Sequence, residues 1–143
     1  MNKAYIKLVP ASVKQTMTID ELKEMLEYYK EITTKTGEQL DWPYGQAAFP
    51  YEMQDETNDN KRQLYLAAKQ DRYHSIKLSI DEEQTLAADA NEAPQTIIQL
   101  ALTNQSTYGD KGKANELGKF LANKLQGELH LFNGRIMYYY KRK

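Results

Sequence analysis

The sequence predicts an α+β fold: a two-layer, mainly antiparallel sheet with two main helices on one face. Two stretches, at about 19–36 and 113–125, carry apolar residues at helical spacing, and shorter segments around them fit strands. Asn133-Gly134 adds the strongest short signal for a β-hairpin. The expected order of elements is β-α-β-β-(α)-β-α-β-β, and the 143 residues fit a single domain spanning 1–143.

The N-terminal part is expected to form a strand and then a helix. Residues 5–9 alternate between apolar and polar side chains, as a strand with one buried face does. Thr18 and Glu21 have the spacing of a capping box, in which each side chain accepts a hydrogen bond from the other residue's amide. We therefore predict a helix from about 19 to 36, with Gly37 as its left-handed C-cap.

The middle of the chain is less regular. Residues 38–61 show no clean period and are expected to be irregular. Strands are predicted at 63–69 and 73–80, joined by a short turn. The acidic residues 81–83 are expected to open a short polar helix, because acidic side chains favour a helix N-terminus. A further strand is predicted at 96–103.

The last third is predicted to be a helix followed by a hairpin. The helix is expected at about 113–125, with Gly127 as its C′ residue. Asn133-Gly134 is predicted to form a two-residue type I′ turn between strands at 128–132 and 135–140. Both central positions of this turn need a positive φ, which asparagine and glycine tolerate best.

The composition excludes several classes of site. The chain has no cysteine, which rules out thiol catalysis, disulfides and cysteine-ligated metals and favours a cytoplasmic location. No apolar run approaches the roughly 20 residues that a membrane-spanning helix needs, and no secretory signal is visible. We expect a soluble cytoplasmic protein without membrane contact.

Charge is distributed unevenly along the chain, although the net charge is only −1. Residues 38–92 carry twelve acidic and five basic side chains, and residues 93–143 carry three acidic and eight basic ones. An anion-binding face on the C-terminal part would explain this asymmetry. The interpretation that we favour is that the two parts face each other, within one domain or across a dimer.

A glycine-rich stretch before the last helix is the first candidate site. Residues 107–113 would place free N–H groups and two lysines at a helix N-terminus, which favours anions. The stretch is not a P-loop, because that motif would need glycine at Thr107 and serine or threonine at Ala114. The alternative, which we favour, is a flexible turn with solvated lysines. The candidate anion-binding residues are Gly109, Lys111, Gly112, Lys113 and Arg135.

The hairpin and its basic tail offer a site for nucleic acid. Cations at Arg135 and 141–143 lie near three consecutive tyrosines, and aromatic rings can stack on unpaired bases while cations hold phosphates. Strand alternation puts Tyr138 and Tyr140 on one face. A pI of about 6.1 argues against general affinity for nucleic acids.

The segment 40–51 contains the only tryptophan and several other aromatic residues. Such a segment can bind a partner protein or line a small-molecule pocket. It folds more often over the edge of a sheet or the end of a core, which is the interpretation that we favour. The candidate partner-binding residues are Trp42, Tyr44, Phe49 and Tyr51.

No catalytic, metal or cofactor site is predicted. The acidic stretch at 52–59 fails as an EF-hand, because Asn60 and Leu66 stand where glycine and glutamate are required. His74 and His130 are the only histidines, and neither a ligand spacing nor a nucleophile motif accompanies them. We expect both to be structural residues, and an enzyme is disfavoured.

Two motifs carry a resemblance to a known family. They are Gly109-Asp110-Lys111-Gly112-Lys113-Ala114-Asn115-Glu116 and Gly127-Glu128-Leu129-His130-Leu131-Phe132-Asn133-Gly134-Arg135-Ile136. Through them, most of the chain resembles small Bacillus-type proteins classified only as a domain of unknown function. The resemblance implies a bacterial cytoplasmic protein with an α+β fold, and it implies no activity, cofactor or catalytic residue.

Together these observations favour a small, non-enzymatic intracellular module that binds a partner protein or a second copy of itself. A homodimer through the aromatic segment or a sheet edge is the form that we expect. The alternative is binding of a phosphate-bearing ligand or nucleic acid through Gly109–Lys113 and the basic C-terminal hairpin.

Overall fold

The computed structural model describes residues 3–39, 50–58, 61–68, 72–83 and 95–140. In chain order the elements are β1 (Lys3–Lys7), α1 (Ile19–Gln39), β2 (Tyr51–Asn58), β3 (Lys61–Ala68), β4 (Ser75–Glu83), β5 (Gln95–Leu102), α3 (Tyr108–Leu125), β6 (Glu128–His130) and β7 (Ile136–Tyr138).

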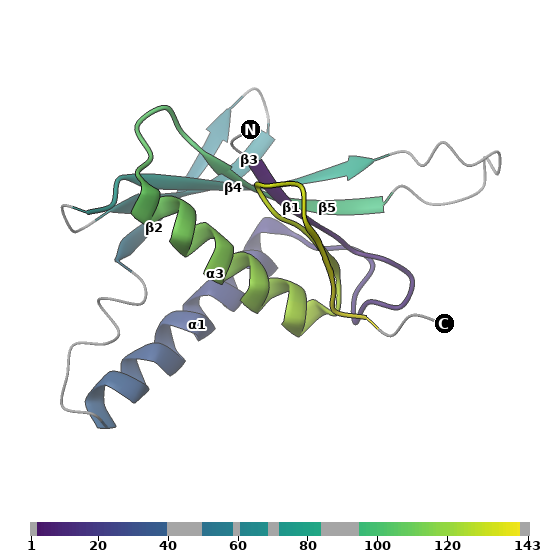
Figure 1. Cartoon of the computed structure of the whole chain (residues 1–143), viewed down its shortest axis with the longest axis horizontal. Coiled ribbons are helices and arrows are strands. Elements are labelled where there is room, and N and C mark those ends of the chain that lie inside the picture. The colour runs from purple at the N-terminus through teal and green to yellow at the C-terminus, as the bar shows by residue number, and fades with distance from the viewer. Residues whose placement is uncertain (1–2, 40–49, 59–60, 69–71, 84–94, 141–143) are drawn as a thin grey trace.

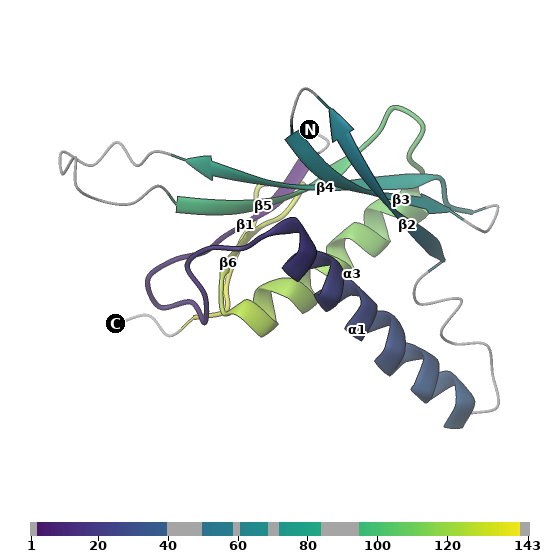
Figure 2. The same ribbon diagram turned by 180° about the vertical axis from the view of Figure 1, so that it is seen from behind.

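The strands form one sheet, and Figure 1 and Figure 2 show both helices on the same face of it. Within the described residues, the seven strands follow the order β2-β3-β4-β5-β1-β6-β7, and each neighbouring pair in this order is antiparallel. The predicted fold class is therefore confirmed: an α+β arrangement of two layers, with an antiparallel sheet and two helices on one face.

The core lies between the sheet and the two helices. Alternate strand residues point toward the helices, because successive side chains of a strand lie on opposite faces. Each helix contributes residues from one face, as the apolar stripes predict. At most 1% of each of the following residues is exposed: Ile6, Leu22, Leu26, Leu64, Leu66, Ile76, Leu78, Ile98, Leu100, Leu117 and Leu121.

Helix α1 begins where the sequence predicts and ends later. The Glu21 amide donates to Thr18 Oγ1 at 3.1 Å and the Thr18 amide donates to Glu21 Oε1 at 3.0 Å, so the predicted capping box is confirmed. The helix continues to Gln39, and the predicted C-cap at Gly37 is therefore wrong. Glycine inside a helix costs only about 1 kcal/mol relative to alanine, which a helix of 21 residues tolerates.

Two predictions for the middle of the chain are wrong. Residues 51–58, expected to be irregular, form β2, which pairs with β3 over its whole length. Residues 81–83, expected to open a helix, continue β4 and pair with residues 95–97 of β5. Both segments are acidic and have low β propensity, but pairing with a neighbouring strand outweighs the intrinsic preference of single residues.

Helix α3 also differs from the prediction at both ends. It begins at Tyr108, five residues before the predicted start at Lys113. At its C-terminus the left-handed residue is Gln126, with φ 55° and ψ 52°, and the prediction of Gly127 for this role is wrong. The Gly127 amide instead donates to the Ala122 carbonyl at 2.9 Å, which closes the last turn.

The hairpin predicted from Asn133-Gly134 is present, but its turn is not type I′. The Gly134 amide donates to the Leu131 carbonyl at 3.0 Å, and the Leu131 amide donates to the Arg135 carbonyl at 2.8 Å. Gly134, at φ 87°, has a positive φ, whereas Asn133 does not. The loop therefore has three residues and ends in a left-handed glycine, an arrangement that Asn-Gly also fits.

Candidate functional site

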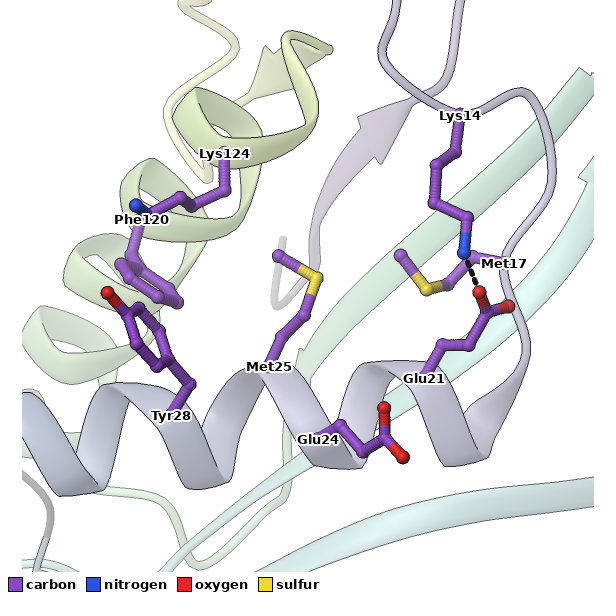
Figure 3. A pocket seen from close by; sticks show the side chains of 8 residues that line it. All are labelled: Lys14, Met17, Glu21, Glu24, Met25, Tyr28, Phe120 and Lys124. Carbon is purple, nitrogen blue, oxygen red and sulfur yellow. Dashed lines mark ion pairs between the residues drawn. The ribbon is translucent and has the colours of Figure 1, made fainter.

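A cavity of about 320 Å³ opens between α1 and α3, and we call it the groove (Figure 3). The loop that connects β1 to α1 closes one end of it, where Figure 3 places Lys14 and Met17. The lining residues are Lys14, Met17, Glu21, Glu24, Met25, Tyr28, Phe120 and Lys124.

The floor of the groove is apolar. Met25 and Tyr28 are one turn apart on α1, and Phe120 faces them from α3, because residues three or four apart share one face of a helix. The Tyr28 and Phe120 rings have centroids 6.4 Å apart. Met17 is buried, whereas 47% of Tyr28 is exposed, so the floor is open to solvent along α1.

The rim of the groove carries both signs of charge. Lys14 forms an ion pair with Glu21 at the end nearest the β1–α1 loop. Lys124 Nζ lies 5.5 Å from the centroid of the Tyr28 ring, a cation–π contact. Within the part of the chain that the structure describes, neither Glu24 nor Lys124 forms an ion pair. An acid and a base at the rim are therefore available to a bound molecule.

The groove has the size and the lining of a binding site. Its volume of about 320 Å³ falls within the range of roughly 300–1,000 Å³ that ligand pockets occupy. Two methionines line it, and the flexible, polarisable methionine side chain adapts to differently shaped partners.

An ion-pair network joins α1, and with it one wall of the groove, to the edge of the sheet. Arg62 of β3 contacts Asp20 of α1 at 2.7 Å and Asp55 of β2 at 3.0 Å, and Lys23 of α1 contacts Asp55 at 3.2 Å. A hydrogen bond from Arg62 holds the pKa of Asp20 below its usual value. The hydrogen bond from Lys23 is the main cause of the lowered pKa of Asp55, and Arg62 lowers it further.

Replacing Arg62 with glutamine is expected to lower the thermal unfolding midpoint at neutral pH and to have little effect in acid. Both carboxylates have folded-state pKa values below their unfolded ones. Their contribution to stability is therefore complete above the unfolded pKa of about 4 and is lost as the pH falls through the folded values. Melting curves between about pH 7 and pH 2 measure this. An equal loss at both ends of this range would contradict the network, and Arg72→Gln, at an exposed arginine outside it, is the control.

Comparison with known proteins identifies the family of the chain. A family model described as a domain of unknown function, DUF1885, matches residues 2–141. The chain belongs to the DUF1885 family. The crystal structure of a protein of unknown function from Bacillus stearothermophilus is 43% identical to this DUF1885 chain, with a TM-score of 0.53, and the match covers 88% of this chain and 91% of that one. No curated protein matches the present chain. The resemblance seen in the sequence is confirmed, and no specific activity follows from it.

In the DUF1885 chain, the residues predicted to form an anion-binding loop lie in the first turns of α3 instead. Thr107 is the N-cap: its Oγ1 accepts from the Asp110 amide at 3.2 Å, and its own amide donates to Asp110 Oδ2 at 2.8 Å. This capping box satisfies N–H groups that the predicted loop would leave free. The pattern Thr-x-x-Asp, from Thr107 to Asp110, is a helix-start signal. The two glycines at 109 and 112 led to the prediction of a loop in its place.

The helix places the predicted anion-binding lysines in different surroundings. Lys111 Nζ lies 5.9 Å from the centroid of the Phe132 ring, so the start of α3 lies beside the turn that precedes Arg135. Lys113 Nζ instead contacts Glu116 at 3.0 Å. The structure therefore brings Lys111 near the hairpin, and anion binding at these residues stays a prediction.

Asp110, at the start of α3, points into the protein and is 0% exposed. Its carboxylate accepts from the Tyr51 hydroxyl at 2.6 Å and from the backbone amides of His74 at 2.9 Å and Ser75 at 3.2 Å. Burial raises the pKa of Tyr51, and the hydrogen bond to Asp110 raises it further, so the phenol stays protonated and donates. Only 1% of Tyr51 is exposed, which leaves it no surface for a partner. Three other predicted partner-binding residues lie outside the described residues: Trp42, Tyr44 and Phe49.

Both histidines make contacts that suit structural residues. His74 Nδ1 lies 2.9 Å from Ser75 Oγ, but Ser75 is fully buried, and Asp110 binds the backbone amide of His74 rather than its ring. His130 Nε2 lies 2.6 Å from Glu128 Oε1. In the ranges that the structure describes, no group of three metal-ligating side chains is placed to hold an ion. No helix in those ranges has the length and apolar character needed to cross a membrane.

The aromatic residues of the hairpin and of β1 pack against the protein's own groups. Tyr138 and Tyr140 lie side by side with ring centroids 5.8 Å apart, as strand alternation predicts. Tyr5 stacks on His130 at 4.4 Å, and Lys7 Nζ lies 5.8 Å from the Tyr5 ring. Ring faces that could stack on bases are thus partly occupied, which disfavours the nucleic-acid alternative.

The groove is not predictable from the amino-acid sequence alone. Met25 and Phe120 belong to the apolar stripes that predict the two helices, and the sequence alone treats such residues as core. Tyr28 is the one residue whose position in the sequence indicates the groove. It widens the apolar stripe of α1 beyond the residues that the core buries. The groove forms where the apolar stripes of α1 and α3 separate. That place depends on the angle between the two helices, which the spacing of apolar residues does not specify.

Proposed function

We propose that this DUF1885 chain is a protein-interaction module whose groove binds an amphipathic helix of a partner protein. The observation that carries the proposal is the apolar floor formed by Met17, Met25, Tyr28 and Phe120, which is open to solvent at Tyr28. Exposed apolar surface with a polar rim is typical of protein-interaction sites. We further propose a bacterial, cytoplasmic protein, which the Bacillus relative and the cysteine-free sequence support.

A helix suits the shape of the groove. Two helices form its walls, and a third helix laid between them can insert apolar side chains from positions i, i+3 and i+4. Glu21 and Tyr28 are separated by seven residues of α1, which span about 10 Å at 1.5 Å per residue. This length accommodates two turns of a partner helix, and therefore two or three apolar anchors.

The charges at the rim of the groove indicate which kind of partner helix would bind. Glu24 lies on α1 and Lys124 on α3, so the two unpaired rim charges stand on opposite walls of the groove. A partner helix with a basic residue on one side of its apolar stripe and an acidic residue on the other would meet both charges. Charged rims contribute more to orientation and specificity than to affinity.

Replacing Met25 with lysine is expected to weaken helix binding at least about tenfold, because it places a charge in the apolar floor. The probe is a displayed library of amphipathic helical peptides, selected on the wild-type chain, with Kd then measured on purified variants. Phe120→Ala is expected to act in the same direction by removing the opposite wall. Ile136→Lys is the matched control, because Ile136 is also an exposed apolar residue but lies on β7, outside the groove.

Unchanged Kd values in both groove variants would refute the proposal, provided that circular dichroism shows native folds. A library that yields no binder at all would refute it equally. The rim gives a second criterion: selection on Glu24→Lys is expected to replace the basic flank of the enriched peptides with an acidic one.

A further inference from the structure

A carboxylate–histidine pair lies on the face of the sheet opposite to the two helices. Glu128 and His130 flank Leu129 on β6, and Leu129 is 0% exposed and belongs to the core. Because successive side chains of a strand lie on opposite faces, Glu128 and His130 point away from the core. His130 stands opposite Tyr5 of β1 in the register. Figure 1 and Figure 2 show α1 and α3 on the core side, so neither helix covers the pair.

The pair fixes which ring nitrogen of His130 carries the proton. Nε2 lies 2.6 Å from Glu128 Oε1, and the Tyr140 hydroxyl donates to Glu128 Oε2 at 3.1 Å. An ionised carboxylate only accepts hydrogen bonds, so Nε2 carries a proton and donates it to Glu128. In the neutral ring the lone pair is then on the other nitrogen, Nδ1.

The nitrogen that holds this lone pair is open to solvent. In the part of the chain that the structure describes, His130 has no hydrogen bond besides the one to Glu128. In the same residues, the side-chain oxygen or nitrogen that is buried without a partner is Asn115 Oδ1, so His130 Nδ1 is not sealed from solvent. The His130 side chain as a whole is 14% exposed. The accessible part of the ring therefore includes a nitrogen with an available lone pair.

The neighbours of His130 hold its ring in place and add a positive charge. The ring stacks on Tyr5, with centroids 4.4 Å apart and planes 11° apart. Lys7 Nζ lies 5.8 Å from the centroid of the Tyr5 ring, and Lys7 stands opposite Glu128 in the ladder. A cation beside the ring favours the approach of an anionic reagent. A histidine oriented by a carboxylate, which Tyr140 orients in turn, has the arrangement of an activated nucleophile.

We propose that His130 is a phosphoryl acceptor, which takes a phosphoryl group on Nδ1 from a small donor of the acyl phosphate or phosphoramidate class. Nδ1 attacks the phosphorus and forms an N–P bond. The bond from phosphorus to the donor's oxygen or nitrogen breaks, and its electron pair leaves with the carboxylate or with ammonia. The ring becomes positively charged with the proton still on Nε2, and the Glu128 carboxylate balances this charge. The site uses neither wall of the groove and does not depend on the proposed helix binding.

Phosphoramidate is the probe that tests this site. The chain has two histidines, so the variant His74→Gln keeps His130 as its single one. Intact-mass spectrometry counts the phosphoryl groups, and phosphorus NMR identifies the nitrogen that carries them. We expect one phosphoryl group on Nδ1, and none after the further change His130→Gln. In urea the contact with Glu128 is lost, so we expect the unfolded chain to react more slowly and at both nitrogens.

The variant Glu128→Gln, made in the same single-histidine chain, tests whether the carboxylate positions the ring. A glutamine side chain both donates and accepts, so it no longer determines which ring nitrogen carries the proton. We expect the rate to fall about 10–100-fold and the product to appear on both nitrogens. A purely structural role of Glu128 would leave the choice of nitrogen unchanged. Glu52→Gln is the matched control, because it makes the same change on β2, outside the site.

Circular dichroism establishes that each variant is folded before the rates are compared. Absence of a phosphoryl group on His130, or a product on Nε2 of the folded chain, would overturn the proposal. A folded chain that reacts no faster than the unfolded one would overturn it too, because the contacts around His130 would then add nothing to its reactivity. The same conclusion would follow if Glu128→Gln reacted at the parent rate and at the same nitrogen.

Discussion

Replacing Asp110 with alanine is expected to destabilise the fold by about 3–5 kcal/mol, because several buried donors would lose their acceptor together. The carboxylate is fully buried and accepts from the Tyr51 hydroxyl and from the backbone amides of His74, Ser75 and Thr107. It thereby ties β2, the start of β4 and the N-terminus of α3 to one point. Urea unfolding followed by circular dichroism measures the loss as a shift in the transition midpoint.

Two milder variants separate the contributions of individual hydrogen bonds to this loss of stability. Asp110→Asn keeps the shape and one carbonyl oxygen, so it is expected to cost less than alanine, about 1–3 kcal/mol. Tyr51→Phe removes a single donor and should cost about 1–2 kcal/mol. In the double variant Tyr51→Phe with Asp110→Ala, the two losses are expected to be less than additive because the residues share a hydrogen bond. Strict additivity would show that the bond contributes nothing to stability.

Replacing Gly127 with alanine is expected to cost about 1–3 kcal/mol, since the new methyl group would enter space that β1 already fills. A Cβ at Gly127 would lie 2.8 Å from Ile6 Cγ2 and 3.0 Å from the Lys7 carbonyl oxygen. The second neighbour is backbone in the middle of the sheet, so it moves only if the pairing of β1 is disturbed. Thermal and urea unfolding of the variant measure the effect.

Gly112 provides the opposite case within the same segment of chain. It lies on the exposed side of α3, and a Cβ there would have no neighbour within 4 Å. Gly112→Ala is therefore expected to stabilise the protein by up to about 1 kcal/mol through helix propensity. Equal effects at the two positions would contradict the packing described for Gly127.

The parts of the fold that follow from local chemistry are predictable from the sequence. The Thr18–Glu21 capping box begins α1 as expected, and the apolar stripes of both helices face the sheet. Asn133-Gly134 marks a hairpin, although it does not specify the loop type. In each of these cases neighbouring residues supply both partners of the interaction, so spacing alone carries the information.

The parts that depend on distant partners are not predictable in this way. The sequence of β2 is acidic and predicts an irregular segment, but pairing with β3 makes it a strand. Glycines at 109 and 112 suggest a loop, although the contacts of Asp110 with residues 51, 74 and 75 hold a helix there. The groove is the feature that the sequence predicts least, because it exists only where two helices far apart in sequence diverge.

Methionine methyl resonances report directly on whether a partner helix binds in the groove. Methyl-labelled methionine gives reporters inside and outside it: Met17 and Met25 line the groove, whereas Met53 on β2 and Met137 on β7 do not. We expect titration with a selected amphipathic peptide to shift the methyl resonances of Met17 and Met25 and to leave those of Met53 and Met137 in place. Shifts confined to Met53 or Met137, or no shift at saturation, would contradict helix binding in the groove.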